Sequence, residues 1–393
     1  MKFCTKTTIP ESAVNVTFNE EGISSVYSSN IQFQNLSKEV WKKRQEKFEK
    51  IATESKSDTN YDCVIGVSGG KDSYYQVHVC LQYGLKPLLV TYHGNNFLPE
   101  GDYNRDRMRD VFNCDHLIFG PSIKTLKKLN RICFKKMGDM NWQNHCGIFT
   151  YPIHIAAKFK IPLIVWGEVA WDISGMFSPD DYVEFNSRVR KEHSLRGFDW
   201  KDMLNSSDER DRLEEKDLIW TKYPEDQEIA KQNTRGIYIG NYFNWDANSH
   251  VKLVIDKYGW KPAEKPFERT YRNFSNLDDR YENGIHDLMK FIKFGYGRAT
   301  DHTTKDITAG YMTRDEGVEM VRKYDHVVSS DLSYWLNYVD MQEEEFWKIA
   351  DSFRSNKVWR IENNKWVKDN IWGGASEYGE VHLTKKEQNK YIK

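Results

Sequence analysis

The stretch that decides the fold is CVIGVSGGKDSYYQVHVCLQYG, residues 63–84. It begins with a continuous apolar run of strand length, residues 63–67, and ends with a helical pattern that stops before Gly84, a residue typical of helix C-caps. The six residues SGGKDS, at positions 68–73, lie between the two. We therefore expect a buried strand, a glycine-rich turn and a helix in direct succession.

The alternation of strand and helix continues along the chain. Further continuous apolar runs lie at residues 87–92, 116–119, 161–166 and 236–240. Helical patterns separate most of them, at residues 102–113, 124–137 and 148–160. Continuously apolar strands that alternate with helices indicate a parallel sheet covered by helices on both faces. The expected fold class is α/β, with a mainly helical C-terminal region at residues 280–355.

Three parts are expected from the changes in composition. Residues 1–36 form a polar N-terminal segment with weak strand signals, and residues 37–55 an amphipathic helix with Ser37 as its N-cap. The α/β domain is expected to span residues 37–260, and the C-terminal region residues 261–393. The polar, charge-rich residues from about 170 to 235 interrupt the α/β pattern. They are expected to form an insertion or a substrate-covering region.

Composition excludes several classes of protein. A hydrophobic fraction of 39% and an aromatic fraction of 14% argue against disorder. With a net charge of -1, the chain has no excess of positive charge for non-specific binding of nucleic acid. There is no apolar run of membrane-spanning length, no apolar signal segment and no C-x-x-C pair among the six Cys. We expect a cytoplasmic enzyme that binds neither nucleic acid nor a membrane.

The SGGKDS turn carries the chemistry. Gly69 and Gly70 let backbone N–H groups approach an oxyanion, and a helix N-terminus adds unpaired donors and partial positive charge. The hydroxyls of Ser68 and Ser73 and the Lys71 cation complete a cradle for phosphate or pyrophosphate. A plain glycine turn is the competing interpretation.

Asp72 separates this turn from a Walker P-loop, in which Ser or Thr follows the Lys. A carboxylate at this position suits Mg²⁺, a hard cation that prefers oxygen ligands. The Ser-Gly-Gly-x-Asp-Ser string resembles the signature of the PP-loop ATP pyrophosphatases. That resemblance implies a Rossmann-like, adenine nucleotide alpha hydrolase fold that binds ATP and Mg²⁺. It also implies attack by an acceptor oxygen on the α-phosphorus of ATP.

Longer segments are similar to the N-acetyl sugar amidotransferases of surface polysaccharide, pseudaminic acid and legionaminic acid biosynthesis. The similar segments are residues 64–76, 87–92, 127–138, 147–152, 161–168 and 293–301. The resemblance implies that the acetamido group of a sugar or nucleotide sugar is adenylylated on oxygen and then converted by ammonia into an acetamidino group. It further implies a separate glutaminase subunit and a barrel subunit similar to those of imidazole glycerol phosphate synthase.

The N-terminal cysteines depart from the family pattern. Many relatives carry two Cys pairs there, suited to a structural metal, whereas this chain keeps Cys4 and has Thr7, Ser24 and Tyr27 at the other positions. A further pair before His145 appears here as Asn141 and Asn144. Hydroxyls and amides do not replace thiolates on zinc, so we predict no zinc site.

Gly167, Glu168 and Tyr92 follow predicted strands, where sites form in open α/β sheets. Tyr92 and Gly167 are candidates for contacts with the nucleotide, and Glu168 for Mg²⁺ or the acceptor. The competing interpretations are a core aromatic for Tyr92 and an ordinary helix cap for Glu168.

Asn141, Trp142 and His145 form a polar and aromatic cluster. The Trp is a candidate for stacking on a sugar ring, Asn141 for its hydroxyls, and His145 for proton transfer during ammonia attack. A capping loop with a satisfied His is the competing interpretation.

The run at residues 295–302, which overlaps the family-like segment 293–301, carries Arg298 and Asp301, with Lys305 just beyond. Arg298 is expected to pair bidentately with a phosphate or carboxylate of the acceptor. A surface turn held by salt bridges is the alternative. The candidate catalytic residues are thus Lys71, Asp72 and His145.

Two other functions fit parts of the sequence. A tRNA-modifying PP-loop enzyme has the same ATP chemistry, but the neutral charge and the lack of paired cysteines weigh against it. A non-catalytic assembly subunit is the second alternative, against which the intact SGGKDS turn argues.

Overall fold

The computed structural model describes the chain except for residues 59, 169–179, 205, 207, 232 and 381–393. Within the described residues, the central sheet has five parallel strands in the order β3-β2-β1-β4-β5. These are β1 (Cys63–Gly66), β2 (Pro87–Tyr92), β3 (His116–Phe119), β4 (Leu163–Trp166) and β5 (Arg235–Tyr238). The chain order reverses between β1 and β4, which is where open α/β sheets bind ligands. The expected α/β fold with a parallel sheet is confirmed.

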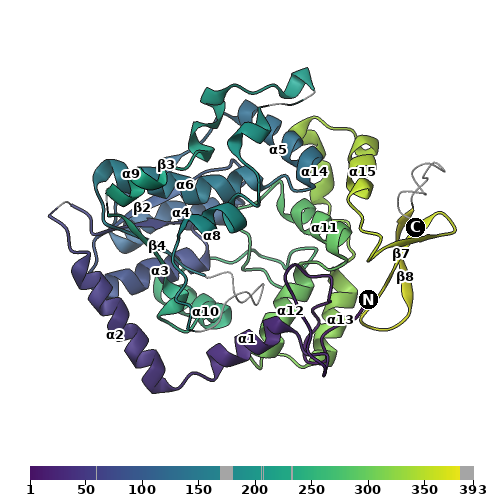
Figure 1. Ribbon diagram of the computed structural model, residues 1–393, viewed down its shortest axis with the longest axis horizontal. Coiled ribbons are helices and arrows are strands. Elements are labelled where there is room, and N and C mark those ends of the chain that lie inside the picture. Colours follow the sequence, from purple (N-terminus) through teal and green to yellow (C-terminus); the bar gives the residue numbers. More distant parts are fainter. Residues whose placement is uncertain (59, 169–179, 205, 207, 232, 381–393) are drawn as a thin grey trace.

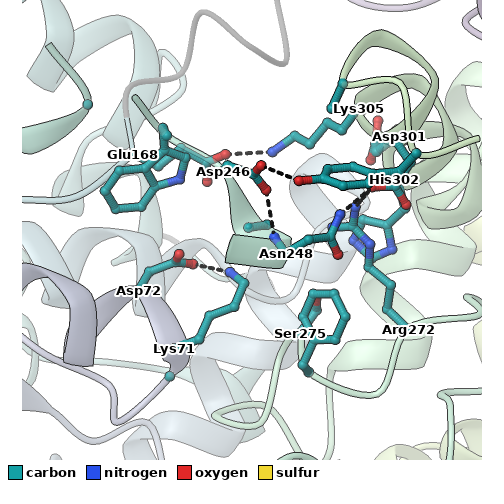
Figure 2. A pocket seen from close by; sticks show the side chains of 18 of the residues that line it. Lys71, Asp72, Glu168, Asp246, Asn248, Arg272, Ser275, Asp301, His302 and Lys305 are labelled. Atoms are coloured by element: carbon teal, nitrogen blue, oxygen red, sulfur yellow. Dashed lines mark hydrogen bonds and ion pairs between the residues drawn. The ribbon is translucent and has the colours of Figure 1, made fainter. Parts of the chain in front are cut away.

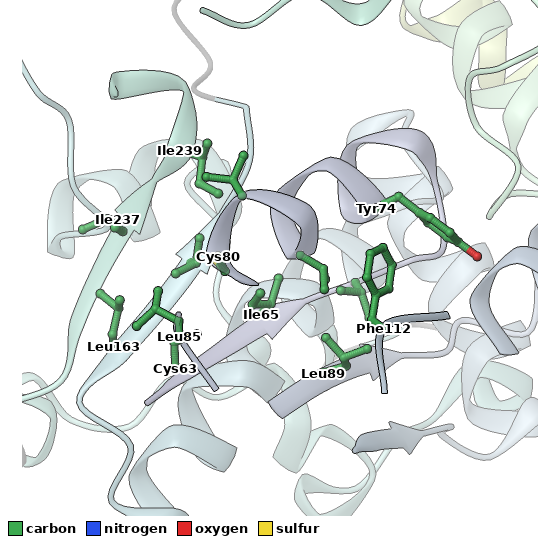
Figure 3. Close-up of a cluster of buried hydrophobic side chains, with 14 of the residues drawn as sticks. Cys63, Ile65, Tyr74, Cys80, Leu85, Leu89, Phe112, Leu163, Ile237 and Ile239 are labelled. Atoms are coloured by element: carbon green, nitrogen blue, oxygen red, sulfur yellow. The ribbon is translucent and has the colours of Figure 1, made fainter. Parts of the chain in front are cut away.

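The sheet lies between two layers of helices (Figure 1). Alternate residues of each strand pack against opposite layers. Ile65, Leu89 and Leu163 pack on one face (Figure 3). That face is covered by α2 (Lys38–Glu54), α3 (Lys71–Gln82), α4 (Pro99–Phe112) and α10 (Ala247–Tyr258). Val64, Leu88 and Ile164 pack on the other face against α6 (Trp142–Phe159), and α5 (Ile123–Met137) packs on α6 in turn.

Helix α6 begins six residues before the expected start at residue 148. Gly147, just before the expected start, and Pro152, within the expected range, both lie inside the helix. A Cβ on Gly147 would come within 2.4 Å of the ring of Tyr92, so this glycine allows α6 to pack closely on the end of β2. Trp142 and His145 therefore belong to the first turns of α6 instead of a loop before it.

The polar insertion is made of short helical turns in its described part. These include α8 (Ser187–Val189) and α9 (Asp226–Lys231), with 3-10 turns between them. Met203, Leu213 and Trp220 from this region pack on α5 and α6. The described residues between 180 and 231 do not line the main pocket, so of the two expected roles they fit an insertion and not a substrate-covering region.

The C-terminal region is mainly helical, as expected. Its helices are α11 (Asn283–Phe294), α12 (Arg298–Thr308), α13 (Arg314–Tyr324), α14 (Asp331–Val339) and α15 (Glu343–Ser352). An antiparallel sheet follows, formed by β6 (Arg360–Glu362), β7 (Lys365–Asp369) and β8 (Ala375–Glu380). Phe134 and Met140 pack into the core of α11, α14 and α15, which joins this region to the α/β domain.

The N-terminal segment folds onto the C-terminal helices (Figure 1). The weak strand signals there correspond only to isolated bridges, and residues 25–34 form the helix α1 (Ser25–Gln34). Thr8 hydrogen-bonds to Thr303 on α12, with 2.7 Å between the hydroxyl oxygens. α1 also lies against α12. The N-terminal segment and the C-terminal helices therefore form one wall facing the sheet.

Candidate functional site

The SGGKDS turn leaves the carboxyl end of β1 and enters α3. Gly69 has φ +82°, and a Cβ there would lie 2.6 Å from the backbone of Arg105. Only glycine therefore fits this position without strain. The carbonyl oxygen of Gly69 accepts a hydrogen bond from the indole nitrogen of Trp260 at 2.9 Å. The turn is thus clamped between α4 and the segment that follows α10.

The two serines of the turn brace its backbone. Ser73 Oγ accepts from the N–H of Ser68 at 2.9 Å, and Ser68 Oγ accepts from the N–H of Gly70 at 3.4 Å. Gly70 is the N-cap of α3 and, having no side chain, gives no side-chain cap. The first turn of α3 therefore offers uncapped N–H groups to an anion, as at other phosphate-binding helix N-termini.

Lys71 and Asp72 form an ion pair at the start of α3, with 2.5 Å between Nζ and Oδ2. Lys71 is buried, whereas the Asp72 side chain is one-third exposed. Burial alone would raise the pKa of the Asp72 carboxyl, but Lys71 and His250 outweigh it and lower that pKa. Asp72 is therefore an anion held between two nitrogen groups.

The turn opens into a cavity of about 580 Å³ (Figure 2). Helix α3 contributes Lys71 and Asp72, and α12 contributes Asp301, His302 and Lys305 from the opposite wall. Other lining residues come from α1, α2, the start of α10 and the segment before α11, and include Asn30, Trp41, Trp245, Asp246, Arg272 and Asp278. The pocket thus lies between the sheet, the N-terminal segment and the C-terminal helices.

Charged groups on the far wall are held in pairs. Lys305 Nζ lies 2.5 Å from Glu168 Oε1, and this pair bridges α12 to the end of β4. Arg272 donates to Asp306 at 2.5 Å. Arg298 donates from Nε to both carboxylate oxygens of Asp287, at 2.9 and 3.1 Å. The bidentate edge of Arg298 that we expected to meet the acceptor is therefore occupied by Asp287.

His302 lies in the same wall and is buried. Its Nδ1 is 2.6 Å from the hydroxyl oxygen of Thr270. Burial, together with the positive charges of Arg272 and Arg298, holds the pKa of His302 well below its ordinary value. A neutral imidazole at neutral pH therefore faces the cavity.

The donors beside the turn fit a magnesium ion carried with a nucleotide. Asp72 and Asp278 line the same part of the pocket, and each affects the other's charge. Asp72 Oδ1 is buried and makes no hydrogen bond with the described residues. Mg²⁺ commonly uses one or two carboxylates and completes its shell with phosphate and water oxygens. Within the described residues, no group of three or more His, Cys, Asp or Glu side chains is arranged to hold a metal by itself.

Several predicted site residues lie outside this pocket. Tyr92 is buried, and its hydroxyl donates to Gln143 at 3.2 Å. Trp142 is fully buried, and its indole nitrogen donates to the carbonyl oxygen of Leu195 at 3.0 Å, so neither face of the ring is open to a sugar. Gly167 adjoins the pocket without lining it, because its Cα faces Gln76 and Trp245.

Asn141, Asn144 and His145 belong to a second polar cluster. Asn141 donates to Asp279 at 3.2 Å, and Asn144 donates to Glu282 at 3.0 Å. His145 Nε2 lies 2.9 Å from a guanidinium nitrogen of Arg196. The cluster is joined to the pocket by the segment at residues 278–282, which begins with the pocket residue Asp278. The structure therefore places His145, the candidate for proton transfer, in this second cluster and not among the residues that line the main pocket.

The sequence-based prediction missed the pocket residues Trp245, Arg272 and Asp278, among others. It also missed His250, which lies behind the pocket wall beside Asp72. Each stands in a polar stretch without a motif, and only the fold brings it to the turn. His302 directly follows the family-like segment 293–301, and its place beside Asp301 was the one signal available.

The N-terminal cysteine lies among hydroxyls. Cys4 Sγ accepts from the N–H of Ser24 at 3.3 Å, and the side chains of Ser24 and Thr7 lie beside it. All three residues are buried. The backbone loop at these positions is therefore closed by thiol and hydroxyl hydrogen bonds. The prediction that it holds no zinc stays a prediction.

The described part of the chain contains no helix long and apolar enough to span a membrane.

Comparison with known proteins identifies the C-terminal region. Residues 268–371 match the family model described as LPS biosynthesis protein WbpG-like, C-terminal domain. The matched residues include the pocket residues Arg272, Asp278, Arg298, His302 and Lys305. Among solved structures, the NMN synthetase from Francisella tularensis is similar at 13% identity and a TM-score of 0.27, covering 59% of this chain and 99% of that one. That likeness is too low to carry an argument. No curated protein matches.

Proposed function

We propose that the chain is an ATP-dependent amidotransferase acting on an N-acetylated sugar or nucleotide sugar, because residues 268–371 match the WbpG-like C-terminal domain of lipopolysaccharide biosynthesis. The amide oxygen of the acceptor attacks the α-phosphorus of ATP, and pyrophosphate leaves. Ammonia then attacks the imidate carbon, and AMP leaves with the former amide oxygen. The sum is acetamido sugar, ATP and ammonia giving acetamidino sugar, AMP and pyrophosphate.

One observation carries this proposal. The SGGKDS turn and the family-matched residues 268–371 form opposite walls of the same 580 Å³ cavity. A nucleotide whose outer phosphates lie on the turn has its α-phosphorus directed into that cavity, where an acceptor bound to α12 meets it. Both substrates therefore have a place within reach of one another.

In the first step, the attack on the α-phosphorus, groups of the chain bind and stabilise the negative charge of the outer phosphates. The uncapped N–H groups at the start of α3 and the Lys71 ammonium hold the β- and γ-phosphates and stabilise the pyrophosphate as its charge develops. Asp72 and Asp278 are the residues that would hold Mg²⁺ there. When bound, Mg²⁺ supplies further neutralisation of phosphate charge.

The second step needs a group that accepts a proton from the attacking ammonia. His302 lines the cavity beside Asp301 and Lys305, and its lowered pKa leaves the imidazole unprotonated at neutral pH, as a proton acceptor must be, while making it a weak base. His145, the candidate from sequence, lies in the second polar cluster and hydrogen-bonds to Arg196. We therefore assign the proton transfer to His302.

The ammonia is proposed to come from a separate glutaminase subunit with a barrel subunit. Cys4, the cysteine nearest the N-terminus, is buried among the hydroxyls of Thr7 and Ser24 and is not placed to attack glutamine. A purified chain that releases ammonia from glutamine without a partner would contradict this part of the proposal.

The test is product analysis with the purified chain, ATP, Mg²⁺, ammonium chloride and a panel of N-acetylated sugars and nucleotide sugars. The proposal predicts AMP and pyrophosphate in equal amounts, formed only when the correct acceptor is present. Formation of ADP and orthophosphate would contradict it. An acceptor whose N-acetyl is replaced by a free amine is the matched control and is expected to give no turnover.

A further inference from the structure

Asp72 has a second neighbour on the side away from Lys71. His250, on α10, points its Nδ1 at Asp72 Oδ1 across 3.6 Å. Both atoms are buried, and neither makes a hydrogen bond with any described residue. A buried acceptor and a buried ring nitrogen that face each other just beyond hydrogen-bond distance need only a small movement to pair.

His250 itself is held firmly. Its ring stacks on Tyr75, with 3.6 Å between centroids and 17° between planes. Trp245 meets it edge-on, with centroids 4.7 Å apart. Trp245 in turn fits against Gly167, where a Cβ would lie 2.6 Å from the indole. The imidazole is therefore fixed by packing and not by a hydrogen bond at Nδ1.

The arrangement matters because Lys71 has two tasks. In this structure its ammonium pairs with Asp72 Oδ2 at 2.5 Å. Under the proposed function the ammonium turns to the phosphates and leaves Asp72 Oδ2 free for Mg²⁺. A carboxylate that loses one partner needs another to keep its orientation, and partners of this kind orient metal-binding side chains in general.

We propose that His250 is a positioning residue that holds Asp72 through Nδ1 while Lys71 is engaged with the nucleotide. The inference rests on the proposed function and deepens it, because it concerns the metal that accompanies ATP. His250 touches neither the nucleotide nor the acceptor, and it acts only through the orientation of Asp72.

Three substitutions separate this role from simple packing. His250→Phe keeps the aromatic ring between Tyr75 and Trp245 but removes Nδ1. His250→Asn places its amide group near the position of Nδ1, whereas His250→Gln places it near the position of Nε2. His78→Phe is the matched control. His78 is also buried beside Tyr75, but it hydrogen-bonds to Tyr258 and does not contact Asp72.

The readout is binding of Mn²⁺ to the full chain with ATP, followed by electron paramagnetic resonance, and binding of ATP in EDTA, followed by calorimetry. The Phe and Gln variants are expected to bind Mn²⁺ about tenfold more weakly in the presence of ATP, the usual size for loss of a partner to a metal ligand. Their affinity for ATP in EDTA is expected to stay unchanged. The Asn variant and His78→Phe are expected to match the parent chain.

The Mn²⁺ affinities of the variants distinguish failure of the role of His250 from failure of the proposed function. Equal Mn²⁺ affinity in the parent chain and in the Phe and Gln variants overturns the role of His250 and leaves the proposed function standing. An Asn variant as weak as the Gln variant overturns the assignment to Nδ1. If His250→Phe does not fold, the comparison of Asn with Gln decides alone. If the parent chain binds no Mn²⁺ with ATP, both the proposed function and this inference fail.

Discussion

The indole nitrogen of Trp260 donates a hydrogen bond of 2.9 Å to the carbonyl oxygen of Gly69. Gly69 is the tightest point of the turn, because its φ is positive and its Cα lies against Arg105. The phosphate-binding turn is therefore shaped by its own glycine and by a buried tryptophan from a distant part of the chain.

Alanine substitutions at the two glycines of the turn are expected to have different effects on the stability of the fold. Gly69→Ala forces a side chain into a positive-φ position and onto the backbone of Arg105, at a cost of at least about 1–3 kcal/mol of unfolding free energy. Gly70 has φ -68°, and its Cβ would meet only Ser68 Oγ, at 3.4 Å. Gly70→Ala is expected to change stability by no more than about 1 kcal/mol.

Gly70→Ala is expected to affect nucleotide binding more than stability. The Gly70→Ala methyl group projects into the anion cradle, so ATP is expected to bind about tenfold more weakly, equal to about 1.4 kcal/mol. Urea unfolding and calorimetry measure the two effects. Full ATP affinity in Gly70→Ala would contradict a phosphate site at the start of α3.

Lys71→Ala is expected to lower the rate of pyrophosphate release by about 10²–10³-fold, the usual loss when one donor to a developing negative charge is removed. The physical reason is that no other ammonium in the described residues lies within hydrogen-bond distance of Asp72 at the start of α3. Lys252→Ala, on the exposed surface of α10, is the control and is expected to keep full activity. Pyrophosphate release at the parent rate in Lys71→Ala would exclude the assigned role.

Trp142 is expected to matter for stability and not for the acceptor. Trp142→Phe removes the hydrogen bond to Leu195 and some packing, and we expect a loss of about 1–3 kcal/mol. The KM for the acceptor is expected to stay unchanged in the folded variant. Trp245→Ala is the comparison, because Trp245 lines the pocket and its loss is expected to raise the KM of at least one substrate. A rise in acceptor KM in Trp142→Phe would restore the stacking role that its sequence context suggested.

Glu282 is expected to make stability depend on pH. Burial raises the pKa of this carboxyl to about 8, against hydrogen bonds from Asn130 and Asn144. The folded chain therefore keeps a proton that the unfolded chain loses above the ordinary Glu value. Its stabilising contribution is complete below about pH 4.5 and is lost as pH rises to about 8, at about 1.4 kcal/mol per pH unit.

Glu282→Gln removes that slope, since the amide mimics the protonated acid. Urea midpoints of the parent and the variant at pH 6, 7 and 8 measure the effect. The stability of the variant relative to the parent is expected to increase as pH rises. Glu344→Gln, at an exposed position at the start of α15, is the control. Parallel pH curves for the parent chain and Glu282→Gln would contradict a protonated Glu282.

Local features of the fold were readable from the sequence. The apolar run from Cys63 and the glycine-rich turn predict a strand, a turn and a helix, because the signals lie within a few residues of one another. The same holds for the strand at residues 87–92, which the structure shows with the expected bounds. Such signals depend on neighbours in the chain, and tertiary contacts do not override them here.

Contacts between distant residues were not readable. Asp278 and Arg272 reach the pocket only because the segment before α11 crosses beside the turn, and nothing in their own neighbourhood marks them. Trp142 stands between amides in the sequence and so suggested an exposed ring, yet α6 buries it against the insertion. The early start of α6 was not predicted either, and the close approach of Gly147 to Tyr92 is a contact between residues distant in the chain.

The most direct test follows the acetamido oxygen. An acceptor labelled with ¹⁸O in its N-acetyl carbonyl is incubated with the purified chain, ATP, Mg²⁺ and ammonium. The masses of the products are then measured by mass spectrometry. The account predicts one ¹⁸O in the phosphate group of AMP and none in pyrophosphate, in step with the acetamidino product. Label found in orthophosphate, or product formed with unlabelled AMP, would contradict adenylylation of the amide oxygen.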